Sequence, residues 1–159
     1  KKIFSRPTAN NGMNRLTAGL NGSYIYTNAK VNDPDIAATD TDGSQLEGAA
    51  PWIANFDLSH TYVSAGYSFT NTLVLGYVGE KVYTIRTQGF QDVMEEGVAT
   101  LDFVSQAKLG KHIALTLKAR NLLNPSYQLS RKANGSGQKV ILGDYKKGIN
   151  VSLGVSCTF

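Results

Sequence analysis

The strongest constraint on the fold lies in residues 145–159, where every second residue from Ile149 onward is apolar and the alternate ones are small or polar. Successive side chains of a β-strand point to opposite faces of a sheet, whereas a helix would mix the two sets. Fifteen residues at about 3.3 Å each would span about 50 Å, and a tilted strand needs only roughly 9–11 residues to cross a bilayer. The pattern predicts a membrane-spanning strand whose apolar face is formed by Ile149, Val151, Leu153, Val155, Cys157 and Phe159.

Five further stretches show the same two-residue period, and together with 145–159 they predict six long strands. Their approximate bounds are 15–31, 50–63, 67–85, 97–109 and 112–122. Residues 1–6 add the expected end of a seventh strand that stops before Pro7. Because the links at 63–66 and 110–111 are short, neighbouring strands should pair as antiparallel hairpins. The predicted fold class is therefore all-β, an antiparallel up-and-down meander.

The links alternate between short and long. The long ones cover residues 32–50, 86–97 and 121–144 and should all lie at one end of the strands. Outer-membrane barrels show this asymmetry between periplasmic turns and extracellular loops. Aromatic residues near the strand ends fit the interfacial girdles of such barrels, although strand propensity in a soluble core would also explain them. They are Tyr24, Tyr26, Trp52, Tyr62, Tyr67, Tyr77, Tyr83, Phe103, Tyr145 and Phe159.

Composition narrows the classes of function. No apolar run approaches 18 residues, so membrane crossing would have to rely on strands. The net charge is +4, but the basic residues are scattered, which argues against nucleic-acid binding. Cys157 cannot form an internal disulfide, and on an apolar strand face it acts as a small hydrophobe. No pattern of an enzyme or of a bound cofactor is present.

Two groups of charged residues are candidates for ligand contact. On the polar faces of the strands, six residues would line the lumen of a large barrel, where they would contact a plug or ligand or form inter-strand charge pairs. They are Asp57, Glu80, Asp102, Lys108, Lys118 and Arg120. In the longest link, Arg131, Lys132 and Lys139 could contact an anionic ligand or a polysaccharide, or belong to a solvated loop.

Metal binding has little support in the sequence. His60 and His112 are far apart and lack metal-ligand spacing, so each is expected on a strand face or at a rim. The acidic stretch 33–43 could hold Ca²⁺, but it lacks the later Glu at the EF-hand distance.

Several stretches, in order, resemble the C-terminal barrel segment of TonB-dependent outer-membrane receptors of the Bacteroidetes type. They are 46–59 (LEGAAPWIANFDLS), 79–83 (GEKVY), 92–93 (DV), 101–103 (LDF), 119–125 (ARNLLNP) and the closing stretch 145–159. The resemblance implies a multi-pass β-barrel of 22 strands in the bacterial outer membrane, of which residues 1–159 would supply the last six or so.

The resemblance also implies a function. Such a receptor imports a scarce nutrient, such as a siderophore, haem, a vitamin or a glycan, with energy relayed by TonB. The plug and the TonB-contacting part would lie outside this chain. The implied partners are membrane lipid, the rest of the barrel with its plug, and the barrel-assembly machinery. That machinery would read the last strand, where Ile149, Val151, Leu153, Val155 and Phe159 match the family's ending; Cys157 stands where an aromatic is common.

Three alternatives remain open at this point. The chain could be a complete small outer-membrane barrel with an adhesive or structural role. It could be a soluble ligand-binding barrel with its apolar face turned inward. It could also be a barrel segment that an outer-membrane assembly or secretion complex binds through an open strand edge.

Overall fold

The computed structural model of the chain describes residues 2–8, 12–28, 45–85 and 91–158. These residues form eleven strands in two antiparallel sheets, so the all-β prediction is confirmed. Within the described ranges, the structure has no helix long and apolar enough to cross a membrane.

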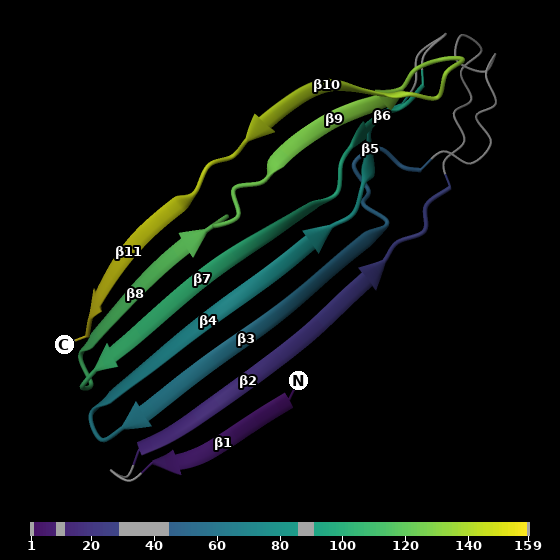
Figure 1. Ribbon diagram of the computed structural model, residues 1–159. Coiled ribbons are helices and arrows are strands. Elements are labelled where there is room, and N and C mark those ends of the chain that lie inside the picture. Colours follow the sequence, from purple (N-terminus) through teal and green to yellow (C-terminus); the bar gives the residue numbers. More distant parts are fainter. Residues whose placement is uncertain (1, 9–11, 29–44, 86–90, 159) are drawn as a thin grey trace.

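The main sheet has seven strands in the order β1-β2-β3-β4-β7-β8-β11 (Figure 1). Every neighbouring pair is antiparallel, as a meander requires. The strands are β1 (Lys2–Thr8), β2 (Gly12–Tyr24), β3 (Trp52–Ser64), β4 (Tyr67–Val78), β7 (Val98–Leu109), β8 (Ile113–Arg120) and β11 (Asn150–Cys157). Strands β1 and β11 form its two edges.

A second sheet continues four of these strands beyond the loop end of the main sheet (Figure 1). Its strands are β5 (Lys81–Thr84), β6 (Val93–Glu95), β9 (Ser126–Lys132) and β10 (Lys139–Lys146), in the order β10-β9-β6-β5. Along the chain, β5 directly follows β4, β6 precedes β7, β9 follows β8 and β10 precedes β11. We call this second sheet the extension.

Two tight turns set the register of the main sheet. Gly66 and Gly110 have φ of 92° and 66°, a left-handed conformation that costs glycine little. The N–H of Gly110 donates to the carbonyl of Gly66 at 2.5 Å, so the two turns lie side by side. The short links therefore lie at one end of the strands, which we call the turn end, and the long links lie at the other, which we call the loop end.

The register aligns the apolar residues of all seven strands on one face. Leu20 pairs with Phe56, and Phe56 pairs with Leu75. These positions are open to solvent: Leu20 is 80% exposed and Leu153 is 73% exposed. We call this the apolar face. Its exposed large side chains are Phe4, Leu16, Leu20, Tyr24, Trp52, Phe56, Tyr67, Phe69, Leu73, Leu75, Tyr77, Leu109, Ile113, Leu117, Val151, Leu153 and Val155.

The opposite, polar face carries cross-strand hydrogen bonds between neutral side chains. The hydroxyls of Ser59 and Thr72 lie 2.9 Å apart, and the Asn55 carboxamide donates to Asn21 at 3.0 Å. Such pairs stabilise neighbouring strands on a wet surface. The predicted separation of polar and apolar faces is confirmed.

The buried core is small and lies where the two sheets meet. Among the described residues, the buried apolar side chains are Ala50, Val82, Val98 and Tyr127, at 3–8% exposure. The segment before β3 reaches the edge of the extension, where the N–H of Gly48 donates to the carbonyl of Val82 at 2.8 Å.

The predicted strand bounds need five corrections. Strand 15–31 begins earlier, at Gly12, and ends at Tyr24; the first strand continues through Pro7 to Thr8, at a sheet edge where proline is tolerated. Strand 67–85 stops at Val78 and resumes as β5. Link 121–144 contains β9 and most of β10, and stretch 145–159 is divided by residues 147–149.

Asparagine chemistry explains the break between the sheets. Asn121 and Asn124 have φ of 59° and 43°, values that asparagine adopts more readily than most residues. The Asn121 N–H donates to Asp102 Oδ1 at 2.8 Å, and its side-chain amide donates to the Gly148 carbonyl at 2.7 Å. Gly148 N–H in turn donates to Asn124 Oδ1 at 3.1 Å. The link between β8 and β9 is therefore hydrogen-bonded to the link between β10 and β11.

Replacing Asn121 tests this junction. We expect Asn121→Ala to lower the free energy of unfolding by about 1–3 kcal/mol, because alanine keeps the strained φ and loses the bond to Gly148. Asn121→Gly relieves the strain and should cost less. Urea unfolding, with hydrogen exchange at residues 121–125 and 147–149, measures both; equal losses would contradict the role of the left-handed backbone.

Candidate functional site

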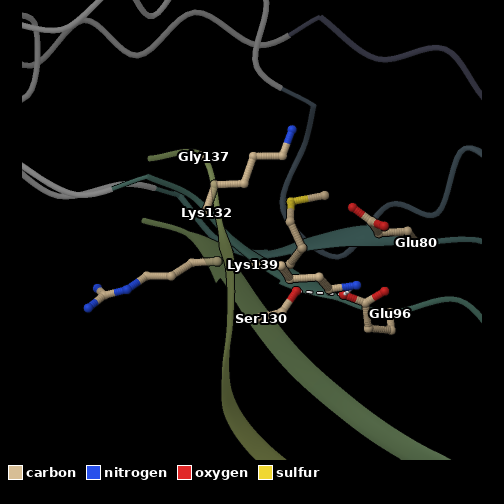
Figure 2. Close-up of a pocket in the computed structure, with 8 residues that line it drawn as sticks. Glu80, Glu96, Ser130, Lys132, Gly137 and Lys139 are labelled. Carbon is tan, nitrogen blue, oxygen red and sulfur yellow. Dashed lines mark hydrogen bonds and ion pairs between the residues drawn. The ribbon is translucent and has the colours of Figure 1, made fainter. Parts of the chain in front are cut away.

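A cavity of about 240 Å³ opens within the extension (Figure 2). Residues from three of its strands and their flanking links form the wall, which is predominantly charged and polar. The lining residues are Glu80, Met94, Glu96, Ser130, Arg131, Lys132, Gly137 and Lys139.

Strand register brings these residues together. Met94 on β6 pairs with Ser130 on β9, and Lys132 on β9 pairs with Lys139 on β10. Ser130 and Lys132 are two positions apart on one strand, so all four side chains belong to the same face of the extension. Glu80 and Glu96 come from the links that join this sheet to β4 and β7.

Glu96 is the centre of the polar contacts in the cavity. The Ser130 hydroxyl donates to Glu96 Oε1 at 2.5 Å, and the Lys139 ammonium lies 2.5 Å from the same oxygen. Figure 2 shows both side chains directed toward this carboxylate. The Glu96 N–H also donates to the Gln128 carbonyl at 2.9 Å. One residue thus ties β9 and β10 to the start of β7.

These contacts change the acidity of Glu96. The hydrogen bonds from Lys139 and then Ser130 stabilise the carboxylate and hold the pKa of Glu96 below its usual range. Ser130 is only 3% exposed, so its hydroxyl depends on this acceptor. The carboxylate is therefore a structural anchor for the wall of the cavity.

Basic side chains outnumber acidic ones in the lining of the cavity. The basic ones are Arg131, Lys132 and Lys139, the acidic ones are Glu80 and Glu96, and Lys139 is paired with Glu96. Lys132 is exposed, and in Figure 2 its side chain extends away from the Glu96 group. Guanidinium and ammonium donors beside a carboxylate suit a polar ligand that carries negative charge.

No metal-binding group accompanies these charges in the part of the chain that the structure describes, because no three His, Cys, Asp or Glu side chains gather there in a way that could hold a metal ion. The acidic stretch 33–43 lies outside that part. The Ser130 hydroxyl that lines the cavity donates to the Glu96 carboxylate, which is also paired with Lys139.

The cavity unites residues from both predicted groups. Arg131, Lys132 and Lys139, expected in a long loop, lie at the ends of β9 and β10 instead. Glu80, expected on the wall of a lumen, lies beside them at the end of β4. Whether they bind a ligand stays a prediction.

The other five predicted lumen residues lie on the polar face of the main sheet, away from the cavity. Val74 pairs with Asp57 on one side and with Asp102 on the other. Lys118 pairs with Val104, and Lys108 with Ala114. Arg120 lies opposite Asn150. None of the five forms an ion pair with a residue that the structure describes. Whether these charges pair across strands or contact a plug or ligand stays a prediction.

The residues of the predicted assembly signal fall on or beside the last strand. Val151, Leu153 and Val155 lie on the apolar face of β11 and are 65–73% exposed. Ile149, 53% exposed, belongs to the link before β11, because the strand begins at Asn150. Phe159 lies outside the described residues.

The two histidines occupy the expected kinds of position. His60 lies on a strand face in β3, and His112 lies in the turn before β8. His112 Nδ1 is 2.7 Å from the carbonyl oxygen of Thr158.

Sequence reasoning missed Met94, Glu96 and Ser130. Glu96 stands in a stretch predicted as a loop, and it belongs to no motif. The polar and apolar alternation of 126–132 was the available signal for β9, whereas Val93–Glu95 is too short to show a period.

Comparison with known proteins gives no relative. No family model, curated protein sequence or solved structure matches the chain.

The Glu96 anchor predicts a pH dependence. Because its folded pKa is depressed, the carboxylate contributes stability above its unfolded pKa, and that contribution is lost as the pH falls through the folded value. We expect Glu96→Gln to speed amide exchange in β9 and β10 at pH 7 and to have little effect at acid pH. Glu80→Gln, in the same cavity, is the matched control. A difference that persists at low pH would contradict the anchor.

Proposed function

We propose that the chain forms part of the wall of an outer-membrane β-barrel that acts as a TonB-dependent receptor for a scarce nutrient. The observation that carries the proposal is the apolar face, which continues over seven strands and stays exposed. Exposed apolar patches beyond a few hundred Å² mark contacts with a membrane or a partner. A lipid bilayer accounts for an apolar face of this extent without a second protein.

The dimensions of the main sheet fit this role. Strand β3 has 13 residues, which at about 3.3 Å per residue and a tilt of about 45° cross about 30 Å, the thickness of a hydrocarbon core. Aromatic side chains gather at both ends of the apolar face. Tyr24 and Trp52 lie 4.5 Å apart between ring centroids at the loop end, and Tyr62 and Tyr67 lie 5.9 Å apart at the turn end. Such girdles stand at the two membrane interfaces.

The polar face supports a water-filled interior. It carries Ser, Thr and Asn pairs together with charges that have no ion-pair partner among the described residues. Those charges suit a lumen, where water, a plug or a passing ligand would contact them. A soluble barrel with its apolar face turned inward would expose the face that carries Asp57 and Asp102 to solvent, but its aromatic girdles would then have no role.

The extension supports ligand capture at the outer side. In outer-membrane barrels the longer excursions are extracellular, which would place the cavity between Glu80 and Lys139 outside the cell. The excess of positive charge there favours a ligand with anionic groups. The exposed apolar residues of β11 would then serve as the signal for barrel assembly.

Paired arginine substitutions test the membrane wall. Leu73 and Val74 are neighbours on β4, but Leu73 lies on the apolar face and Val74 lies between Asp57 and Asp102 on the polar face. We expect Leu73→Arg to destabilise the inserted protein by about 2–4 kcal/mol, the cost of a cation near the bilayer midplane, and Val74→Arg to be tolerated. Urea titration in phospholipid vesicles measures both. Equal effects, or a protein that stays soluble without lipid, would contradict the wall.

Gene inactivation tests the receptor function. We expect loss of the protein to abolish energy-dependent uptake of one nutrient in a panel of iron complexes, vitamins and glycans, and a protonophore to abolish the same uptake in the parent. Substitution of both Lys132 and Arg131 by Gln should reduce ligand binding while β8 and β11 still assemble, since the pairing of those strands does not involve the extension. Unchanged uptake of every nutrient in the panel would count against a receptor.

A further inference from the structure

The apolar face carries a hollow that is lined by both polar and apolar side chains. Its volume is about 360 Å³, and it lies over β1, β2 and β3 near the turn end of the sheet. Phe4 and Leu16 contribute apolar wall, whereas Arg6, Asn14 and His60 contribute polar atoms, with Ser5 completing the lining. The hollow is therefore amphipathic, although the surface around it is apolar.

Strand register produces this arrangement. Phe4 pairs with Leu16, which pairs with His60. Two residues closer to the turn end and on the same face, Arg6 pairs with Asn14. His60 Nε2 lies 3.1 Å from Asn14 Oδ1, so the two polar side chains support each other. Arg6 stands two residues before the end of β1 at Thr8.

Arg6 is the unusual residue of the group. It is exposed on the apolar face and forms no ion pair with any residue that the structure describes. A guanidinium inside the hydrocarbon region is costly unless it is paired or reaches the interface. Two residues from the strand end, it can reach the headgroup region of a bilayer, where phosphate offers a bidentate partner.

We propose that this hollow binds a glycerophospholipid, with Arg6 on the headgroup phosphate, Asn14 and His60 beside it, and an acyl chain along Phe4 and Leu16. This inference rests on the proposed membrane wall. A ligand with an anionic head and an apolar tail matches both halves of the lining, whereas a free anion would match only the polar half. The turn end of the sheet places the lipid in the periplasmic leaflet.

Native mass spectrometry of the full native protein, released from detergent micelles, tests the site. The probe is palmitoyl-oleoyl phosphatidylglycerol, and a diacylglycerol with the same chains is the comparison without phosphate. We expect the wild type to retain the phospholipid in preference to the diacylglycerol, and Arg6→Gln to weaken this binding about tenfold through loss of a charge-assisted contact. Arg6→Lys, which keeps the charge, should recover part of it.

Arg15→Gln is the matched control, because Arg15 pairs with Ser5 and Thr61 on the polar face of the same strands. It removes the same charge and should leave phospholipid binding unchanged. Equal weakening by Arg6→Gln and Arg15→Gln would overturn the site, as would unchanged binding in Arg6→Gln. Displacement of the phospholipid by inorganic phosphate alone would overturn the role of the acyl chain.

Flotation of the same preparations with phosphatidylglycerol vesicles separates the two proposals. If the wild type and Arg6→Gln both float and retain phospholipid equally, the lipid site is overturned, but the proposed membrane wall is not. A wild-type protein that does not float would overturn the membrane wall and the lipid site with it.

Discussion

Antiparallel register is the constraint on which the rest of the structure depends. Each strand of the main sheet contributes a two-residue alternation, but only a common register places Leu20, Phe56 and Leu75 on one face. A slip of one residue in any strand would turn its apolar side chains to the polar face and its Ser, Thr and Asn residues to the apolar one. The turns at Gly66 and Gly110 oppose such a slip, because each allows only a short connection and the two are hydrogen-bonded to each other. The open apolar face, the polar face and the hollow at Arg6 all follow from this alignment.

The parts of the fold that were predictable from sequence are those governed by periodicity. Alternation along 97–109, 112–122 and 50–63 identified β7, β8 and β3 to within two residues, since one face is apolar and the other is not. The division into two sheets was not predictable in this way. Alternation is regular from Ile149 to Phe159, whereas Lys147 interrupts it, and the chain leaves the strand at 147–149, where Gly148 adopts φ of 78°. Asn121, Asn124 and Gly148 define the break through bonds between distant positions, which a local period cannot reveal.

Only part of the candidate site could be predicted from the sequence, for the same reason. Arg131, Lys132 and Lys139 were recognisable as a cationic group, but their grouping around Glu96 depends on the pairing of β9 with both β6 and β10. Strands as short as Val93–Glu95 carry little signal of their own. Contacts with neighbouring strands stabilise them. The Lys81 ammonium lies 3.4 Å from the Glu95 carboxylate across the β5–β6 pair. The Glu96 carboxylate contacts Ser130 on β9 and Lys139 on β10. Charge pairing thus occurs in the extension, while the charges of the main sheet stay apart.

That contrast has a physical basis in the two environments that the sheets offer. In the main sheet, the polar face satisfies itself with neutral hydroxyl and amide pairs, so Asp57, Lys108 and Lys118 are left to contact something outside the sheet. In the extension, the strands are short, and the buried side chains of Val82 and Tyr127 are supplemented by the Lys81–Glu95 and Lys139–Glu96 ion pairs, which hold neighbouring strands together. The main sheet is held by its backbone ladder, so in the proposed barrel wall the charges of its polar face would remain available to water or a ligand. An outer sheet held by the same charged residues that line its cavity would respond directly to a ligand that competes for Lys139, because displacing that ammonium from Glu96 loosens β10 from β6 and β9.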